Sequence, residues 1–136
     1  MKANRVVICV DGASRGNPGL AAIGATIKDE QGRLIARISQ GIGRTTNNQA
    51  EYRAVIAALE EAIRLGAGQV ELNSDSELVV KQIKGEYRVK KAALKPLYQR
   101  VKQLQSGLES FTINHIPRQQ NREADNLANK ALDSIY

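Results

Sequence analysis

The sequence predicts an α/β domain with a mixed five-stranded sheet flanked by helices. Three β-type segments follow one another near the N-terminus with only short turns between them, which predicts an antiparallel meander. Two further short β segments alternate with helical segments in the remaining chain, giving the order βββαβααβα. There is no repeat, low-complexity run or linker, so residues 1–136 are expected to form a single domain.

The first half of the chain accounts for the meander. Residues Arg5–Asp11 are β-branched and nearly all apolar, which is typical of a central strand buried on both faces. The segment Gly12–Gly19 is dense in turn residues. Two more strands are predicted at Leu20–Lys28 and Arg33–Gln40, joined by a turn at Asp29–Gly32.

The second half contains the helices and the last two strands. Capping residues, apolar periodicity and breakers place their ends. Pro96 is accepted only in the first turn of its helix, or it marks a later start. The expected elements are a helix over 46–65, a strand at Gln69–Ser74, helices over 76–84 and 92–105, a strand over 109–116 and a helix over 121–134.

Composition excludes several classes of protein. Hydrophobic residues make up 42% and charged residues 25% of the chain, values of a soluble globular protein and not of a disordered one. No apolar run reaches the roughly 20 residues that cross a bilayer, and the N-terminus does not have the pattern of a signal peptide. A cytoplasmic protein is therefore expected. The single cysteine, Cys9, excludes an internal disulfide and a cysteine-based zinc site.

The net charge of +6 is concentrated in one tract. The segment from Lys81 to Lys102 has a net charge of +7, including Lys90 and Lys91, and the remaining chain has a net charge of −1. Such a tract on a near-neutral body favours a polyanionic partner. A solvated helix face is the alternative interpretation.

Four carboxylates occupy ends of elements. Asp11 ends the first strand, where a buried charge is unfavourable unless it binds something. Glu51 heads the apolar stripe of its helix, so it should face the core. Asp75 follows the fourth strand and Asp125 lies in the first turn of the last helix. The last two have structural alternatives, a helix N-cap for Asp75 and a helix-dipole contact for Asp125.

If these four carboxylates converge, they repel one another unless cations neutralise them. Hard oxygen ligands select Mg²⁺ or Mn²⁺. Two such ions side by side activate a water and stabilise a leaving oxygen, which is the chemistry of phosphodiester cleavage. The sequence thus favours a two-metal nuclease.

Four segments together resemble type 1 ribonuclease H, in the order in which that family has them. They are residues 11–19 (DGASRGNPG), 45–51 (TTNNQAE), 74–76 (SDS) and 121–128 (NREADNLA). The resemblance covers essentially the whole chain and implies a ribonuclease-H-like fold and a metal-dependent endoribonuclease that cuts the RNA strand of RNA–DNA hybrids. It also implies that Asp11, Glu51, Asp75 and Asp125 hold two Mg²⁺ ions, for which Mn²⁺ can substitute.

The same resemblance implies how a substrate is bound. Asn17, Asn47 and Asn48 are expected to contact the minor groove, where an amide can both donate to and accept from 2′-hydroxyls. Arg44 and Thr46 are expected to hold a DNA phosphate. Glycines such as Gly12 let the backbone approach the ribose closely. The structural alternatives are that Asn47 and Asn48 only cap the helix, and that Asn17 belongs only to a turn.

The chain departs from well-known bacterial members of the family. It has no tryptophan and no basic handle helix, and its loop before the last helix, residues 117–120, lacks the histidine that often lies there. This resembles the compact archaeal-type branch, in which some relatives also accept double-stranded RNA. The only histidine, His115, is expected to be packed and hydrogen-bonded within a strand, so Arg118 is the better candidate for contacting the substrate.

Three other functions remain open at this point. They are a non-catalytic nucleic-acid-binding module on the same fold, another metal nuclease on that fold, and a nucleotide-binding protein using Gly12–Gly19 as a phosphate loop. The last lacks a GxxxxGK[ST] pattern, and Pro18 removes one amide donor. No exposed apolar stripe demands a partner subunit, so a monomer is expected.

Overall fold

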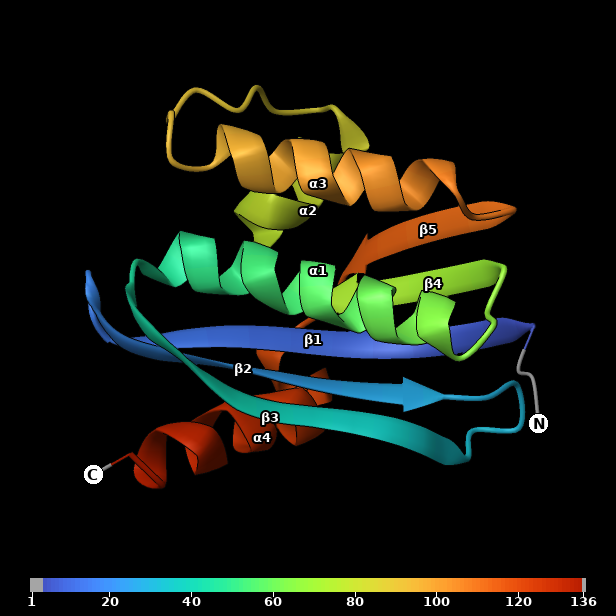
Figure 1. Ribbon diagram of the computed structural model, residues 1–136, viewed down its shortest axis with the longest axis horizontal. Helices are drawn as coiled ribbons and strands as arrows, with labels where there is room; N and C mark the ends of the chain where they lie inside the picture. The colour runs from blue at the N-terminus through green and yellow to red at the C-terminus, as the bar shows by residue number, and fades with distance from the viewer. Residues whose placement is uncertain (1–3, 136) are drawn as a thin grey trace.

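A computed structural model describes residues 4–135 and contains a five-stranded mixed sheet with helices on both faces (Figure 1). The strand order across the sheet is β3-β2-β1-β4-β5. β1 pairs antiparallel with β2 and parallel with β4, and the order βββαβααβα is confirmed. The elements are β1 (Arg5–Gly16), β2 (Gly19–Lys28), β3 (Leu34–Thr45), α1 (Asn47–Arg64), β4 (Gln69–Ser74), α2 (Glu77–Lys84), α3 (Lys95–Ser106), β5 (Ser110–His115), a 3₁₀ turn η1 (Arg118–Gln120) and α4 (Arg122–Asp133).

The N-terminal meander is longer than the sequence predicts. β1 continues through the glycine-rich segment as far as Gly16, which pairs with Gly19, so the turn is confined to Asn17 and Pro18. Glycine is a weak strand former, but pairing with a neighbouring strand outweighs that local preference. The expectation that β1 is buried on both faces was also wrong, because Val7 and Cys9 are only half-buried on the face turned toward α4.

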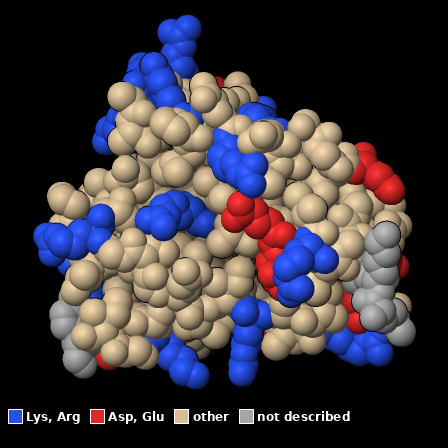
Figure 2. All heavy atoms as spheres, in the orientation of Figure 1, with Lys and Arg blue, Asp and Glu red and all other residues tan. Residues whose placement is uncertain are grey.

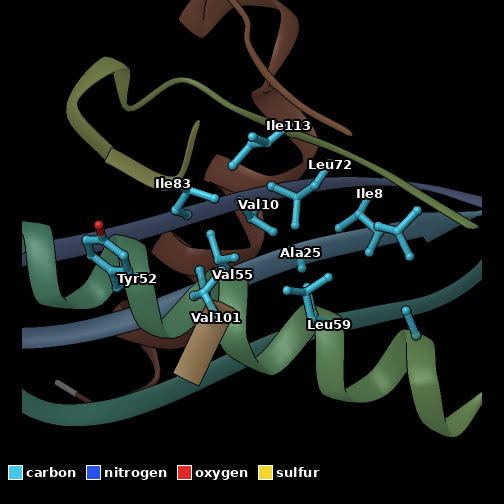
Figure 3. Close-up of a cluster of buried hydrophobic side chains, with 14 of the residues drawn as sticks. Ile8, Val10, Ala25, Tyr52, Val55, Leu59, Leu72, Ile83, Val101 and Ile113 are labelled. Carbon is cyan, nitrogen blue, oxygen red and sulfur yellow. The ribbon is translucent and has the colours of Figure 1, made fainter. Parts of the chain in front are cut away.

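The main hydrophobic core lies between the sheet and α1, α2 and α3. Figure 3 shows Ile8 and Val10 of β1 and Leu72 of β4 directed toward Val55 and Leu59 of α1. All five side chains are fully buried. α4 covers the opposite face over β1, β2 and β3 with a smaller apolar cluster. Among the described residues, no helix has both the length and the apolar character needed to cross a membrane.

The helix starts follow the expected local chemistry. Thr46 is the N-cap of α1 and forms a capping box with Gln49, and Pro96 lies in the first turn of α3, which begins later than predicted. Gly85 ends α2 in the left-handed conformation.

Candidate active site

Two of the four carboxylates lie at the point where the parallel pairing of β1 and β4 ends. The prediction that Asp11 ends the first strand was wrong, because β1 continues through Asp11 to Gly16 by pairing with β2. Val10 of β1 pairs with Ser74 of β4 as the last register pair of this ladder, and Asp11 and Asp75 come next on each strand. Asp11 is only 6% exposed and Asp75 is half-buried. The N-cap of α2 is Ser76, whose hydroxyl accepts from the Val79 amide, so the interpretation of Asp75 as the cap is wrong. Asp75 therefore lies next to Asp11 without capping α2.

The third carboxylate, Glu51, reaches the site from α1 above the sheet. It is 5% exposed and lies on the buried stripe of the helix, as the sequence predicts. Its Oε1 atom accepts from the backbone N–H of Gly12 at 2.5 Å. A Cβ atom on Gly12 would lie 2.3–2.4 Å from the backbone of Ala50 and Glu51. Gly12 thus lets α1 contact β1 directly, and its amide holds the Glu51 carboxylate next to Asp11.

The fourth carboxylate, Asp125, comes from α4 on the other face of the sheet. Gly24 of β2 lies opposite Asp11 in the register, and a Cβ atom there would be 2.2 Å from the carbonyl oxygen of Ala124. α4 therefore contacts β2 directly, one residue before Asp125. The Asn129 amide donates to Asp125 Oδ1 at 3.2 Å and to its backbone oxygen at 3.0 Å. Asp125 also lies in the first turn of α4, so the expected helix-dipole contact is present as well.

The four carboxylates line one depression of about 280 Å³, together with Gly12, Ala13, Asn47 and Arg118. Asp11, Glu51 and Asp75 offer oxygen atoms within 4.8 Å of one another. Asp125 is outside that tightest group, but it lines the same depression and contributes to raising the pKa of Asp11. Segments far apart in the sequence thus bring four negative groups to one place.

The protein alone does not stabilise the charges of this cluster. Burial, followed by the charges of Glu51 and Asp75, raises the pKa of Asp11 to about 9. Burial also raises the pKa of Glu51 to about 8, against the lowering effect of the Gly12 amide. At neutral pH, ionisation of both groups therefore requires compensating positive charge. The atoms available to bind a metal are all carboxylate oxygens, the ligand type that Mg²⁺ and Mn²⁺ prefer. The residues therefore fit a divalent metal centre.

The asparagines expected to contact a substrate lie beside this depression. Because Thr46 is the N-cap, the interpretation of Asn47 and Asn48 as caps is wrong. The Asn47 amide N–H donates to Asn17 Oδ1 at 3.0 Å, which joins the β1–β2 turn to the start of α1. The turn containing Asn17 therefore lies beside the start of α1. We call Asn17, Asn47 and Asn48 the asparagine rim. Arg44 is exposed near the end of β3 and pairs with Leu20.

A second, larger hollow of about 490 Å³ lies next to the start of α1 and contains no acidic cluster. Asn48 lines it together with residues of α2 and of the following loop, including Gln82, Tyr87, Arg88, Lys90 and Lys91. Figure 2 shows basic side chains gathered at the upper left, where Figure 1 has the loop between α2 and α3. Lys90 and Lys91 are thus near the asparagine rim, as a substrate-binding role requires.

The loop after α2 is held by buried polar contacts. The Tyr52 hydroxyl donates to Gln82 Oε1 at 2.8 Å, and Gln82 Nε2 donates to the Arg88 carbonyl at 3.5 Å. The C-terminal part of the basic tract has other partners, since Arg100 pairs with Glu60 and Lys102 donates to the Ile83 carbonyl. Only part of the tract is therefore available to a ligand.

The prediction that His115 is packed was wrong. His115 is the last residue of β5 and is exposed, because β5 is an edge strand and ends there. Arg118, by contrast, lines the carboxylate depression from η1.

Three residues that contact the elements of the site were missed by sequence reasoning. Gly24 interrupts an otherwise apolar strand, which is a signal of close backbone approach that the sequence contained. Asn129 lies four residues after Asp125, a spacing at which helical side chains meet. Asn121 is 1% exposed, and no sequence pattern indicates that its side chain reaches β1.

Comparison with known proteins decides the family. Residues 9–131 match the family described as Reverse transcriptase-like. Ribonuclease HI of Halobacterium salinarum is 46% identical over 132 residues, which is 97% of this chain and 66% of that protein. The chain belongs to the ribonuclease H family. The crystal structure of RNase H1 from the same archaeon superimposes with a TM-score of 0.94 at 46% identity, covering 96% of this chain and 98% of that one.

A second solved ribonuclease H is a complex. LC11-RNase H1, crystallised with an RNA/DNA hybrid, has a TM-score of 0.91 at 41% identity and covers 96% of this chain and 98% of that one. Some ribonuclease H relatives are longer proteins. This chain spans 66% of the Halobacterium protein and 36% of a bifunctional protein of Mycobacterium tuberculosis that is 44% identical to it.

Proposed function

We propose that this ribonuclease H chain is a metal-dependent endoribonuclease that hydrolyses the RNA strand of RNA–DNA hybrids. The observation that carries this proposal is the convergence of Asp11, Glu51, Asp75 and Asp125 from four elements into one depression. Two of these groups have raised pKa values, so a cation completes the site. A binding module without catalysis has no need for such a cluster.

In this proposal the four carboxylates hold two divalent ions. When bound, a pair of such ions supplies an activated water and stabilises the leaving oxygen of the scissile phosphodiester. Asp11 and Asp75 contribute from the point where the β1–β4 pairing ends, Glu51 is held by the Gly12 amide, and Asp125 is held by Asn129. Arg118 lines the same depression and contacts the substrate where negative charge develops.

The rim distinguishes RNA from DNA in this proposal. Asn17, Asn47 and Asn48 present amide groups that both donate to and accept from ribose 2′-hydroxyls. Arg44 binds a phosphate of the DNA strand. The Thr46 hydroxyl accepts from the Gln49 amide N–H and donates to Gln49 Oε1, so Thr46 is held at the start of α1, where it contributes to that phosphate contact. Lys90 and Lys91 attract the duplex electrostatically from the second hollow.

Mg²⁺ is the proposed metal, with Mn²⁺ as a substitute, because both accept oxygen ligands. We propose that the catalytic unit is a single domain, since one continuous hydrophobic core joins the sheet to α1, α2 and α3, and that it acts as a monomer. Double-stranded RNA is a second candidate substrate, because amides that read 2′-hydroxyls also fit a duplex in which both strands carry them.

The test is incubation with three labelled duplexes: RNA–DNA hybrid, double-stranded RNA and double-stranded DNA. Each is incubated with Mg²⁺, with Mn²⁺ or with EDTA. We expect cleavage of the hybrid RNA strand with either metal, and none with EDTA. Cleavage of double-stranded RNA at a comparable rate would extend the substrate range. Activity in EDTA, or no cleavage of the hybrid with either metal, would contradict the proposal.

A further inference from the structure

Asn121 is a buried polar residue at the junction of η1 and α4, and no part of the catalytic scheme above uses it. Its side chain is 1% exposed and its Nδ2 atom donates to the Val10 carbonyl at 2.8 Å. Val10 is the residue before Asp11 and the last residue of β1 that pairs with β4. The Asn121 amide therefore binds β1 immediately beside the catalytic depression.

The backbone of Asn121 connects two further residues of the site. Its N–H donates to the Arg118 carbonyl at 3.0 Å, and its carbonyl accepts from the Asp125 N–H at 3.1 Å. One residue is thus bonded to the turn that bears Arg118, to the helix that bears Asp125 and to the strand that bears Asp11. α4 lies on the opposite face of the sheet from α1, where it packs on β1, β2 and β3, and the Asn121 side chain adds a hydrogen bond to β1 directly beside Asp11.

The Asn121 side chain does not act as an ordinary helix cap. Asn121 occupies the N-cap position of α4, but its side chain makes no hydrogen bond to the first turn. Its Oδ1 atom is buried and has no hydrogen-bond partner within residues 4–135. An unpaired buried acceptor is unfavourable, so the Asn121 side chain is held in place by its NH₂ group and not by Oδ1. That group is bonded to Val10.

We infer that Asn121 is a positioning residue that fixes Asp125 and Arg118 relative to Asp11 and thereby assembles the metal site. It contacts neither substrate nor metal in this scheme, and acts through the residues to which it is bonded. This inference rests on the proposed function. Partners that orient metal ligands typically change metal affinity about 10–100-fold when they are removed.

The test compares Asn121→Leu with a matched control, Asn73→Leu. Asn73 is also buried, and its Nδ2 atom also donates to a β1 carbonyl, that of Ile8 at 3.4 Å. Mn²⁺ affinity is measured by calorimetry on the folded proteins, and single-turnover cleavage and metal-free hybrid binding are measured alongside. Asn121→Ala replaces the leucine variant if circular dichroism shows that leucine is not accommodated.

We expect Asn121→Leu to weaken Mn²⁺ binding about 10–100-fold and to slow single-turnover cleavage similarly, with unchanged metal-free hybrid affinity. Asn73→Leu should lower the melting temperature while keeping Mn²⁺ affinity and rate. Wild-type Mn²⁺ affinity in the Asn121 variant, or an equal loss in the Asn73 variant, overturns the inference and leaves the proposed function intact. A wild-type protein that neither binds Mn²⁺ nor cuts the hybrid overturns both.

Discussion

At the scale of single residues, the carboxylate cluster lowers the free energy of unfolding of the metal-free protein, and the same groups allow it to bind cations. Asp11 is nearly inaccessible to water and lies beside two other carboxylates. Its pKa of about 9 means that the folded protein keeps a proton that the unfolded chain releases near pH 4. The folded, metal-free state therefore binds more protons than the unfolded state between these two values. Its free energy of unfolding must fall as pH rises through that window.

We predict that Asp11→Asn abolishes cleavage and stabilises the metal-free protein at pH 8 by on the order of 1–3 kcal/mol, because folding of the variant no longer requires the uptake of a proton at a buried carboxyl group. The fall in stability between pH 5 and pH 9 should become shallower but not vanish, since Glu51 also has a raised pKa. Urea denaturation in EDTA across this range measures both effects. Full activity of the variant, or an unchanged pH dependence, would show that Asp11 is not part of a charged metal centre.

The different positions of Arg118 and His115 lead to a second prediction. Arg118 lines the depression, whereas His115 is exposed at the end of β5 and is not among the residues that line it. We expect Arg118→Ala to slow single-turnover cleavage by about tenfold or more, which is the range for loss of one group that stabilises transition-state charge. His115→Ala should keep most of the rate. A large loss in the histidine variant alone would reverse the two assignments.

At the scale of elements, two glycines let helices contact the sheet from opposite faces. The absence of a side chain at Gly12 allows α1, which carries Glu51, to lie against β1. The absence of a side chain at Gly24 allows α4, which carries Asp125, to lie against β2. Gly24 and Asp11 are paired in the β1–β2 register, so the distance between α4 and β2 directly sets the distance between Asp125 and Asp11. A strand residue with no contact to substrate thus controls the geometry of the site.

We predict that Gly24→Ala displaces α4, because the new methyl group would lie 2.2 Å from the Ala124 carbonyl oxygen. Crowding of this kind typically costs 1–3 kcal/mol of stability, and cleavage should fall as Asp125 moves away. Gly107→Ala is the control, since a Cβ atom there meets nothing closer than 3.6 Å. Thermal unfolding and single-turnover rates measure the two effects. Equal behaviour of the two variants would mean that α4 is not held by this contact.

At the scale of the whole molecule, charge is divided between a negative depression and a positive surface beside it. The net charge of +6 arises because the tract from Lys81 to Lys102 outweighs a body that is slightly negative. The hollow lined by Lys90 and Lys91 shares the start of α1 with the carboxylate depression. A long polyanion can therefore be attracted by one surface while one of its phosphates meets the other.

Reversing the charges of Lys90, Lys91 and Lys95 should weaken hybrid binding and reduce its salt dependence, with little change in the single-turnover rate. Counterion release predicts that log affinity falls by about 0.9 per neutralised phosphate for each decade of salt. Binding measured at several salt concentrations gives this slope. A matched reversal of Arg100 and Lys102, which have protein partners, should change the slope less. An unchanged slope in the first variant would make the tract a solvated face.

Local patterns in the sequence predicted the order and type of the secondary-structure elements and the identity of the proposed metal ligands. Strand and helix periodicity, capping residues and breakers act over a few residues, so they are readable locally, and the fourth strand is predicted with its observed bounds. Glu51 could be singled out because a charge on a buried stripe violates the helical pattern. The four motifs together then implied ribonuclease H.

Features that depend on contacts between distant segments could be seen only in the folded structure. The extension of β1 to Gly16 results from pairing with β2, and the exposure of His115 results from the edge position of β5. The contacts of Gly24 with α4 and of Asn121 with Val10 join residues about 100 positions apart. No local pattern encodes such contacts, because they exist only once the sheet has formed and α4 has packed against it. The ligands were readable from the chain, but the groups that hold them in place became visible only in the fold.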